Sequence, residues 1–225
     1  MNAFRSLLPV VVAVSLAPFA VAAVPTEAAA LAALSSATDL HEKARACQDL
    51  AIVGGPASVP ALTALLDQEN LADYARSGLE GIKDPAAGAA LRKALGTLSG
   101  RQLAGAVNSL GVRRELAAVP DLQKLALDPK RGVASEALAS LGMIGTGDAA
   151  KTLQKILTDG PADLRVPAAH AALVAAAQLA KDGNVAAARG LLDAVARALP
   201  NGHLASVAKS QAAALGTKPA PAASK

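Results

Sequence analysis

Aromatic and sulfur-containing side chains are almost missing from this chain of 225 residues, which has no Trp, one Tyr, two Phe and one Cys. A single cysteine excludes an intramolecular disulfide, so packing alone must hold the fold together. We interpret Cys47 as a small buried apolar residue, because no companion residues of a cysteine nucleophile are present. The scarcity of aromatic residues also disfavours β-sandwiches and barrels, which draw on them.

The chain also lacks a strong excess of charge of either sign. The chain has 22 Lys and Arg against 18 Asp and Glu, a net charge of +4. Residues 101–158 are its basic part, with 8 basic and 5 acidic residues. The excess is small, acids are interleaved and stacking residues are absent, so we interpret the basic residues as a solvated face and predict no nucleic-acid partner.

The first 23 residues are typical of a secretory signal peptide. A single basic residue, Arg5, precedes an apolar run over 7–16, and small residues follow over 17–23. We predict cleavage near residue 22 or 23 and export to the periplasm or the extracellular space. The apolar run is too short for a membrane anchor, and Cys47 lies too late for a lipoprotein.

Two columns of leucines recur along the rest of the chain with a step of 31 residues. One holds Leu79, Leu110 and Leu141, and the other holds Leu91, Leu122 and Leu153. In an earlier copy of the repeat, Leu50 precedes Leu79 by 29 residues, and Leu62 precedes Leu91 by the same number. A repeat of this length, rich in the helix formers Ala and Leu, predicts helix pairs that bury their apolar faces only by stacking.

We therefore predict an all-α protein, an α-solenoid of about five antiparallel helix pairs with a terminal helix. The predicted pairs are 41–53 with 57–67, 71–82 with 85–98, 100–112 with 115–127, 132–144 with 148–157, and 162–179 with 184–199, followed by a helix over 203–215. The last pair is the most similar to a tetratricopeptide hairpin. The predicted regions are a signal peptide over 1–23, a lead-in segment over 24–37 that is either a capping helix or loose, a solenoid over 38–216, and a disordered Ala/Pro tail over 217–225.

Two blocks of this repeat, AVNSLGVRRELAAVPDL and ASLGMIGTGDAAKTL, resemble HEAT repeats of the short kind also called PBS-lyase HEAT-like, found in exported bacterial proteins. The shared elements are Leu-Gly at the end of the first helix, a short polar turn, and an Ala-rich opening of the second. The resemblance covers about residues 38–159. It implies the solenoid fold and leaves the function open.

The alternative function is that of an enzyme from one of two lines with such repeats, or of an accessory chain whose catalytic domain lies on a neighbouring chain. Deoxyhypusine hydroxylases hold a di-iron centre with several His-Glu pairs, and this chain has one such pair, His41-Glu42. Phycobilin lyases hold a chromophore among aromatic residues, whereas Tyr74 is the only aromatic residue after position 23. No triad, phosphate loop or metal-spaced cluster is present. We therefore predict no catalytic, cofactor-binding or metal-binding residue.

The leading hypothesis is a non-enzymatic scaffold that recognises a protein partner along a curved groove lined by the second helices of the pairs. Basic residues on those helices favour an acidic or extended partner, and the candidates are Arg92, Lys93, Lys124, Lys151 and Lys155.

A second group of residues is predicted to form a hydrogen-bonded ladder between repeats. Asn108 lies in an apolar helical segment, where a polar side chain needs a partner. A bond to the neighbouring turn is favoured over contact with a ligand. Arg113 and Arg114 follow it, and Arg76, one repeat earlier, is positioned to pair with Glu80.

Overall fold

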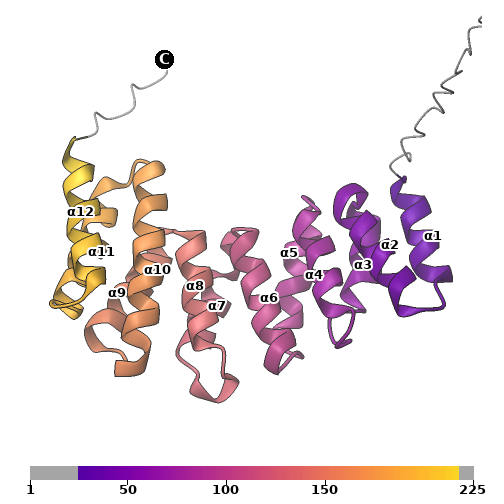
Figure 1. Ribbon diagram of the computed structural model, residues 1–225, viewed down its shortest axis with the longest axis horizontal. Coiled ribbons are helices and arrows are strands. Elements are labelled where there is room, and N and C mark those ends of the chain that lie inside the picture. Colours follow the sequence, from indigo (N-terminus) through magenta and orange to yellow (C-terminus); the bar gives the residue numbers. More distant parts are fainter. Residues whose placement is uncertain (1–24, 218–225) are drawn as a thin grey trace, which may run out of the picture.

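The computed structural model describes residues 25–217, and every regular element within them is a helix. The first helices of the five pairs are α2 (Leu40–Val53), α4 (Ala72–Gly81), α6 (Gly100–Val112), α8 (Ala134–Ile144) and α10 (Ala162–Lys181). Their partners are α3 (Val59–Thr63), α5 (Pro85–Ala94), α7 (Val119–Ala126), α9 (Gly147–Asp159) and α11 (Val185–Ala198). Figure 1 shows the pairs side by side, with α1 (Glu27–Ser36) at one end and α12 (His203–Thr217) at the other. The predicted α-solenoid is confirmed.

Local signals in the sequence set the helix boundaries. Asp39 accepts a hydrogen bond from the backbone of Glu42, whose carboxylate accepts one from the backbone of Thr38, so the two side chains cap the start of α2. Pro60, Pro85 and Pro120 lie in the first turns of α3, α5 and α7, where proline disturbs no helical hydrogen bond. Turns before α3 and α7 form the short 3-10 helices Pro56–Ser58 and Leu116–Ala118, and a third such helix, Pro129–Arg131, follows α7.

The two leucine columns form the core. Their members are fully buried and pack in one continuous cluster through the stack: Leu50, Leu79, Leu110, Leu141, Leu62, Leu91, Leu122 and Leu153. Burying one such side chain contributes roughly 1.5–3 kcal/mol. Tyr74 lies on the surface, so the core among residues 25–217 has no aromatic side chain. Cys47 is buried, as interpreted from the sequence.

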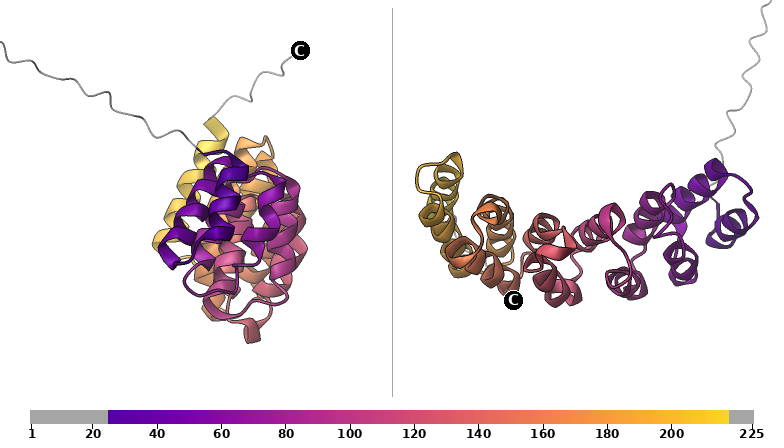
Figure 2. Two further views of the ribbon diagram at one scale, coloured as in Figure 1. Left: turned by 90° about the vertical axis from the view of Figure 1, so that its right-hand side faces the viewer. Right: turned by 90° about the horizontal axis from the view of Figure 1, so that it is seen from below.

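The helix pairs build two layers that pack with different tightness. Each first helix packs closely on the next, in the order α2, α4, α6, α8 and α10, whereas successive second helices contact one another less. Close approach is clear at Gly81 of α4, where an added Cβ would clash with the carbonyl oxygen of Ala51 in α2, and at Gly142 of α8, where it would lie 2.6 Å from the carbonyl oxygen of Ala171 in α10. Figure 2 shows that the stack is bowed, with the tightly packed first helices on its inner side.

The two ends of the solenoid differ from the interior pairs. The lead-in segment forms α1, which packs on α2, and its Glu27 carboxylate accepts hydrogen bonds from the backbone of Gly55 and from both donors of Ser58. The last pair, α10 and α11, whose sequence is the most similar to a tetratricopeptide hairpin, continues the same two layers, because α10 packs on α8 and α11 packs on α9. The predicted signal peptide over 1–23 lies outside the described residues, as does the predicted tail except for Thr217, the last residue of α12.

Candidate partner-binding surfaces

An apolar row lies along the inner face of the bow. The row consists of Ile52, Val112 and Met143, near the ends of α2, α6 and α8, and of Val174, which follows Met143 by one repeat and lies within α10. In α4 the equivalent position is Gly81. Ile52 is 75%, Val112 51% and Val174 50% exposed. These side chains are too exposed to stabilise the core, so the row is a candidate contact surface for a partner.

A second row runs beside it, one helical turn nearer the helix starts. Its members are all exposed and are mostly small or polar: Gln48, Ser77, Asn108, Ala139 and His170. Asn108 therefore does not belong to the ladder between repeats, contrary to the prediction from the sequence. The buried stripe of α6 consists of Leu103, Ala106, Val107 and Leu110, and Asn108 points away from it into solvent. The exposed position of Asn108 instead allows contact with a ligand, which was the less favoured alternative.

The ladder is built on a serine that the sequence analysis missed. Ser109 is fully buried, donates to Glu80 at 2.6 Å and accepts a hydrogen bond from Arg76 at 3.1 Å. Arg76 also approaches Glu80 within its own helix at 3.7 Å, as its spacing suggested. One repeat later, buried Ser140 donates to the carbonyl of Val107 at 2.9 Å. The sequence contains a signal for this ladder, because Ser109 and Ser140 lie 31 residues apart within apolar helical segments.

Arg113 connects the end of α6 to the end of α4. Its guanidinium donates to the carbonyls of Leu79, at 2.6 Å, and of Glu80, at 3.3 Å, and also to those of Ile82 and Asp84. The last carbonyls of a helix have no partner within it, so a cation there satisfies them and complements the helix dipole. Arg113 thereby fixes the angle between two neighbouring repeats.

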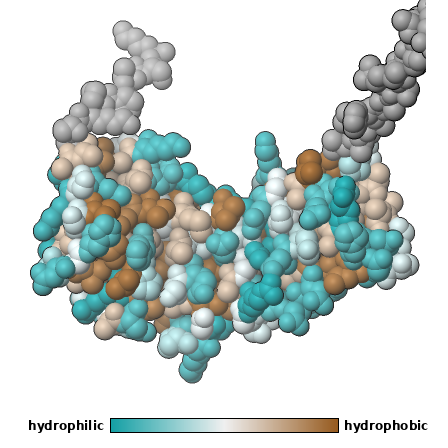
Figure 3. All heavy atoms as spheres, in the orientation of Figure 1, coloured by the Kyte–Doolittle hydropathy of each residue, from teal (hydrophilic) through white to brown (hydrophobic). Residues whose placement is uncertain are grey.

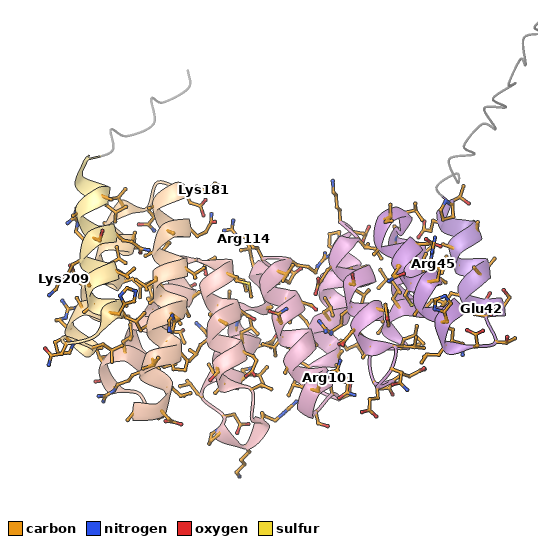
Figure 4. The ribbon with its side chains drawn as sticks, in the orientation of Figure 1. Glu42, Arg45, Arg101, Arg114, Lys181 and Lys209 are labelled. Atoms are coloured by element: carbon orange, nitrogen blue, oxygen red, sulfur yellow. The ribbon has the colours of Figure 1, made fainter. Side chains whose placement is uncertain are left out.

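Arg114 makes the corresponding connection in the other direction. It donates to the carbonyl of Ile144, at the end of α8, at 3.1 Å and approaches Asp182 after α10 at 3.5 Å. Figure 4 shows Arg114 close to the end of α10 that Lys181 marks. A hydrogen bond from Gln178, followed by the nearby charge of Arg114, holds the pKa of Asp182 below its usual value. The Arg114 backbone has a φ of +50°, a left-handed conformation that costs a non-glycine residue roughly 1–2 kcal/mol.

The basic candidates on the second helices lie on the outer layer. Shallow grooves open between these helices, one between α5 and α7 and another, of about 600 Å³, between α7 and α9. Arg92 is paired with Asp121 at 3.0 Å and Lys151 with Asp148 at 2.9 Å, which reduces their availability. Lys93, Lys124 and Lys155 are exposed and form no ion pair with the described residues. The expected single curved groove is therefore replaced by separate grooves on the outer face, because the first helices occupy the inner side.

Apolar surface is unevenly distributed over the molecule. Figure 3 shows it gathering over the C-terminal half, around α10, where Val166 and Val174 are about half exposed. A groove beside Val174 is lined by Met143 of α8 and Gln211 of α12. The inner face is thus most apolar where the last two pairs and α12 meet.

Within residues 25–217, no group of three or more His, Cys, Asp or Glu could hold a metal ion. Burial raises the pKa of the Cys47 thiol to about 11, which keeps it protonated. Between positions 25 and 217, the structure has no helix with the length and apolar character required to cross a membrane.

Comparison with known proteins agrees with this architecture. Residues 88–174, from within α5 to within α10, match the family model of HEAT repeats. The match supports a HEAT-repeat protein and covers the part of the stack in which the 31-residue step is most regular. No curated protein matches the chain.

Proposed function

We propose that this protein is a non-enzymatic scaffold that binds a protein partner on the inner face of its solenoid. The observation that carries the proposal is a row in which apolar side chains recur at one position of the repeat: Ile52, Val112 and Val174 are at least half exposed, and Met143 is partly buried. Exposed apolar surface of this kind is typical of protein interfaces. Because the ladder below the row links α4, α6 and α8, the partner meets a surface that is preorganised in the middle of the stack.

The neighbouring row explains how such a surface can be selective. Gln48, Ser77, Asn108 and His170 provide hydrogen-bonding groups alongside apolar contacts. Buried apolar anchors supply most of the affinity in protein interfaces, and polar groups around them select the partner. HEAT repeats commonly serve as protein-interaction scaffolds, which agrees with this role.

Substitution of the apolar row tests the proposal. The variant Val112→Lys/Val174→Lys changes two half-exposed residues, so it should leave the fold intact, which circular dichroism checks. The matched control is Leu127→Lys, since Leu127 is 55% exposed but lies at the end of α7. Each immobilised protein is incubated with an extract of the native cell envelope, and captured proteins are quantified by mass spectrometry.

The expected result is a partner that the wild type and the Leu127→Lys control retain and that the double variant loses at least tenfold, equivalent to about 1.4 kcal/mol. Equal retention by all three proteins would show that the inner face is not the binding surface.

We further propose that the protein acts in the periplasm or outside the cell. The proposal is supported by Arg5, the apolar run over 7–16 and the small residues over 17–23. Expression of the full chain in a Gram-negative host, followed by fractionation and intact-mass measurement, tests it. A mature protein that begins near residue 23 or 24 in the periplasmic fraction is expected, whereas an uncleaved chain in the cytoplasm would contradict export.

A further inference from the structure

A groove opens at the lower edge of the stack in Figure 1, between the loop after α7 and the starts of α8 and α10. Its volume of about 440 Å³ lies within the range of cavities that hold a ligand. Apolar residues form most of its wall, among them Leu127 and Pro129 on one side and Leu164 of α10 on the other. Leu127 is 55% exposed, so it offers contact area to a ligand. We name this cavity the α8–α10 groove.

The charge of the α8–α10 groove has one sign. Glu136 in the first turn of α8 and Asp163 in the first turn of α10 line it, and no basic residue of the described chain does. Both side chains are exposed, and neither forms an ion pair or hydrogen bond with residues 25–217. By contrast, the grooves between the second helices are lined by both signs, as by the paired Asp148 and Lys151. The α8–α10 groove therefore has a negative charge that a ligand can neutralise.

The cations nearest to this groove in the sequence are directed elsewhere. Arg131 donates to the carbonyls of Leu95 and Leu98, just beyond α5, at 2.7 and 3.1 Å, which turns its guanidinium away from α8 and α10. Arg165 has a buried Nε atom, and neither it nor Lys130 lines the groove. The helix dipoles favour the two carboxylates in their first turns, but the surrounding fold pairs them with no side-chain cation.

The walls of the α8–α10 groove are held in place by the fold. Asp128 accepts a hydrogen bond from the backbone of Lys130 at 3.0 Å and so caps the 3-10 helix Pro129–Arg131. Pro129 on one side of the groove and Pro161 on the other have backbone φ angles fixed by their rings. A ligand therefore meets a preformed cavity and has little conformational freedom of the protein to restrict.

These features define the chemistry of the ligand. The apolar wall accommodates an apolar side chain, and carboxylates on two different helices favour cations close to it. A polypeptide with Leu or Phe beside Lys or Arg provides both. Val166, one helical turn after Asp163, is 48% exposed and continues the apolar surface from the groove onto the inner face. The contact surface is thus larger than the groove itself, which favours a protein segment over a small molecule.

We propose that the α8–α10 groove binds a basic segment of a partner protein. The segment places one apolar side chain against Leu127 and Leu164, and Lys or Arg side chains beside it contact Glu136 and Asp163. This site is separate from the inner apolar row, because Val174 lies 11 residues after Asp163, about 17 Å further along α10. Either site can therefore fail experimentally without the other.

Labelled peptides of equal length test the chemistry of the ligand. The reference peptide has one Leu between two Lys residues in a background of Gly and Ser. One counterpart has Ser in place of Leu, and another has Glu in place of both Lys residues. Fluorescence anisotropy with the full chain gives each dissociation constant at low and at physiological salt. The reference peptide should bind most tightly, about tenfold more tightly than the Ser counterpart, and its affinity should fall as salt increases.

Substitutions of single carboxylates locate the site. Glu136→Gln and Asp163→Asn remove exposed charges, and each should weaken the reference peptide about two- to fivefold, in the range of exposed ion pairs. Glu69→Gln is the matched control and should leave binding unchanged, because Glu69 is an exposed carboxylate without an ion pair, between α3 and α4 in another part of the stack. Circular dichroism checks that each variant is folded.

The variants that test the inner face give the opposite pattern here. Leu127→Lys, the control for the inner face, places a cation in the α8–α10 groove and should weaken the reference peptide about tenfold or more. Val112→Lys/Val174→Lys, which disrupts the inner face, should bind the reference peptide as the wild type does. The same two proteins therefore separate a failure of this proposal from a failure of the inner apolar row as a binding surface.

Several outcomes would overturn the proposal. A dissociation constant of the reference peptide above about 1 mM would show that the groove does not bind such a segment. Equal affinity for the Ser counterpart would show attraction by charge alone. A loss in Glu69→Gln as large as in Glu136→Gln would show that no defined site exists. Tighter binding of spermidine than of the reference peptide would assign the carboxylates to a polyamine, and self-association that Leu127→Lys abolishes would assign the groove to a second copy of this chain.

Discussion

The hydrogen bonds of Arg113 predict that this one side chain contributes strongly to the coupling between repeats. Arg113→Met keeps most of the aliphatic stem and removes the guanidinium that joins α6 to the end of α4. Loss of hydrogen bonds from a charged donor costs about 1.5–3 kcal/mol, and loss of a cation at a helix end about 0.3–1 kcal/mol. We therefore expect the free energy of unfolding to fall by about 2–3 kcal/mol.

Equilibrium unfolding in urea, followed by circular dichroism, measures this change. Arg92→Met is the matched control, because the Arg92–Asp121 pair lies at the surface, with side chains 36% and 33% exposed, and should contribute only about 0–1 kcal/mol. In a stack of repeats, a weakened interface lowers cooperativity, so the Arg113→Met transition should also broaden or separate into two steps. A shift for Arg113→Met no larger than that for Arg92→Met would refute the reasoning.

Three further predictions concern local contacts. Glu27→Gln should lower the thermal unfolding midpoint near neutral pH, because the Ser58 hydroxyl holds the pKa of Glu27 below its usual 4.5. This stabilisation is complete above that value and is lost as pH falls through the lower folded pKa, so wild type and variant should converge in melts at progressively lower pH, and a difference that stays constant through the acidic range would contradict it. Arg114→Ala should be less stable than Arg114→Gly by about 1 kcal/mol, because only glycine relieves the left-handed backbone, and equal urea midpoints would count against this strain. Gly142→Ala should cost about 1–3 kcal/mol, because its methyl group would meet the carbonyl of Ala171, and an unchanged urea midpoint would rule out the close approach of α8 and α10.

The architecture could be predicted because it depends on a pattern that repeats along the chain. Leu79, Leu110 and Leu141 are buried at equal steps, and stacking is the arrangement that buries every member. Helix boundaries followed from local chemistry, such as the capping by Asp39 and the proline at position 85. The sequence does not decide whether the lead-in segment is a helix or a loose segment, because the contacts that hold it, between Glu27 and Gly55 and Ser58, come from a different repeat.

The binding surfaces were harder to predict because they depend on small rotations between repeats. The distance between neighbouring helices, which is short at Gly142, determines which layer lies on the inner side of the bow. The repeat pattern in the sequence does not contain this distance. Asn108 was expected to be partnered because its segment is apolar in sequence, yet it lies off the buried stripe. Ser109, the buried residue beside it, carries the hydrogen bonds to Arg76 and Glu80.

The links between repeats also determine how this chain can fold. The hydrogen bonds of Arg113 to Leu79, Arg131 to Leu95 and Gln123 to Thr152 join residues 34, 36 and 29 positions apart. Such short separations give a low contact order, which is typical of fast folding. Each hairpin can therefore dock as soon as its neighbour has formed, so the array can assemble step by step from its N-terminal end while the remainder of the polypeptide is still being synthesised.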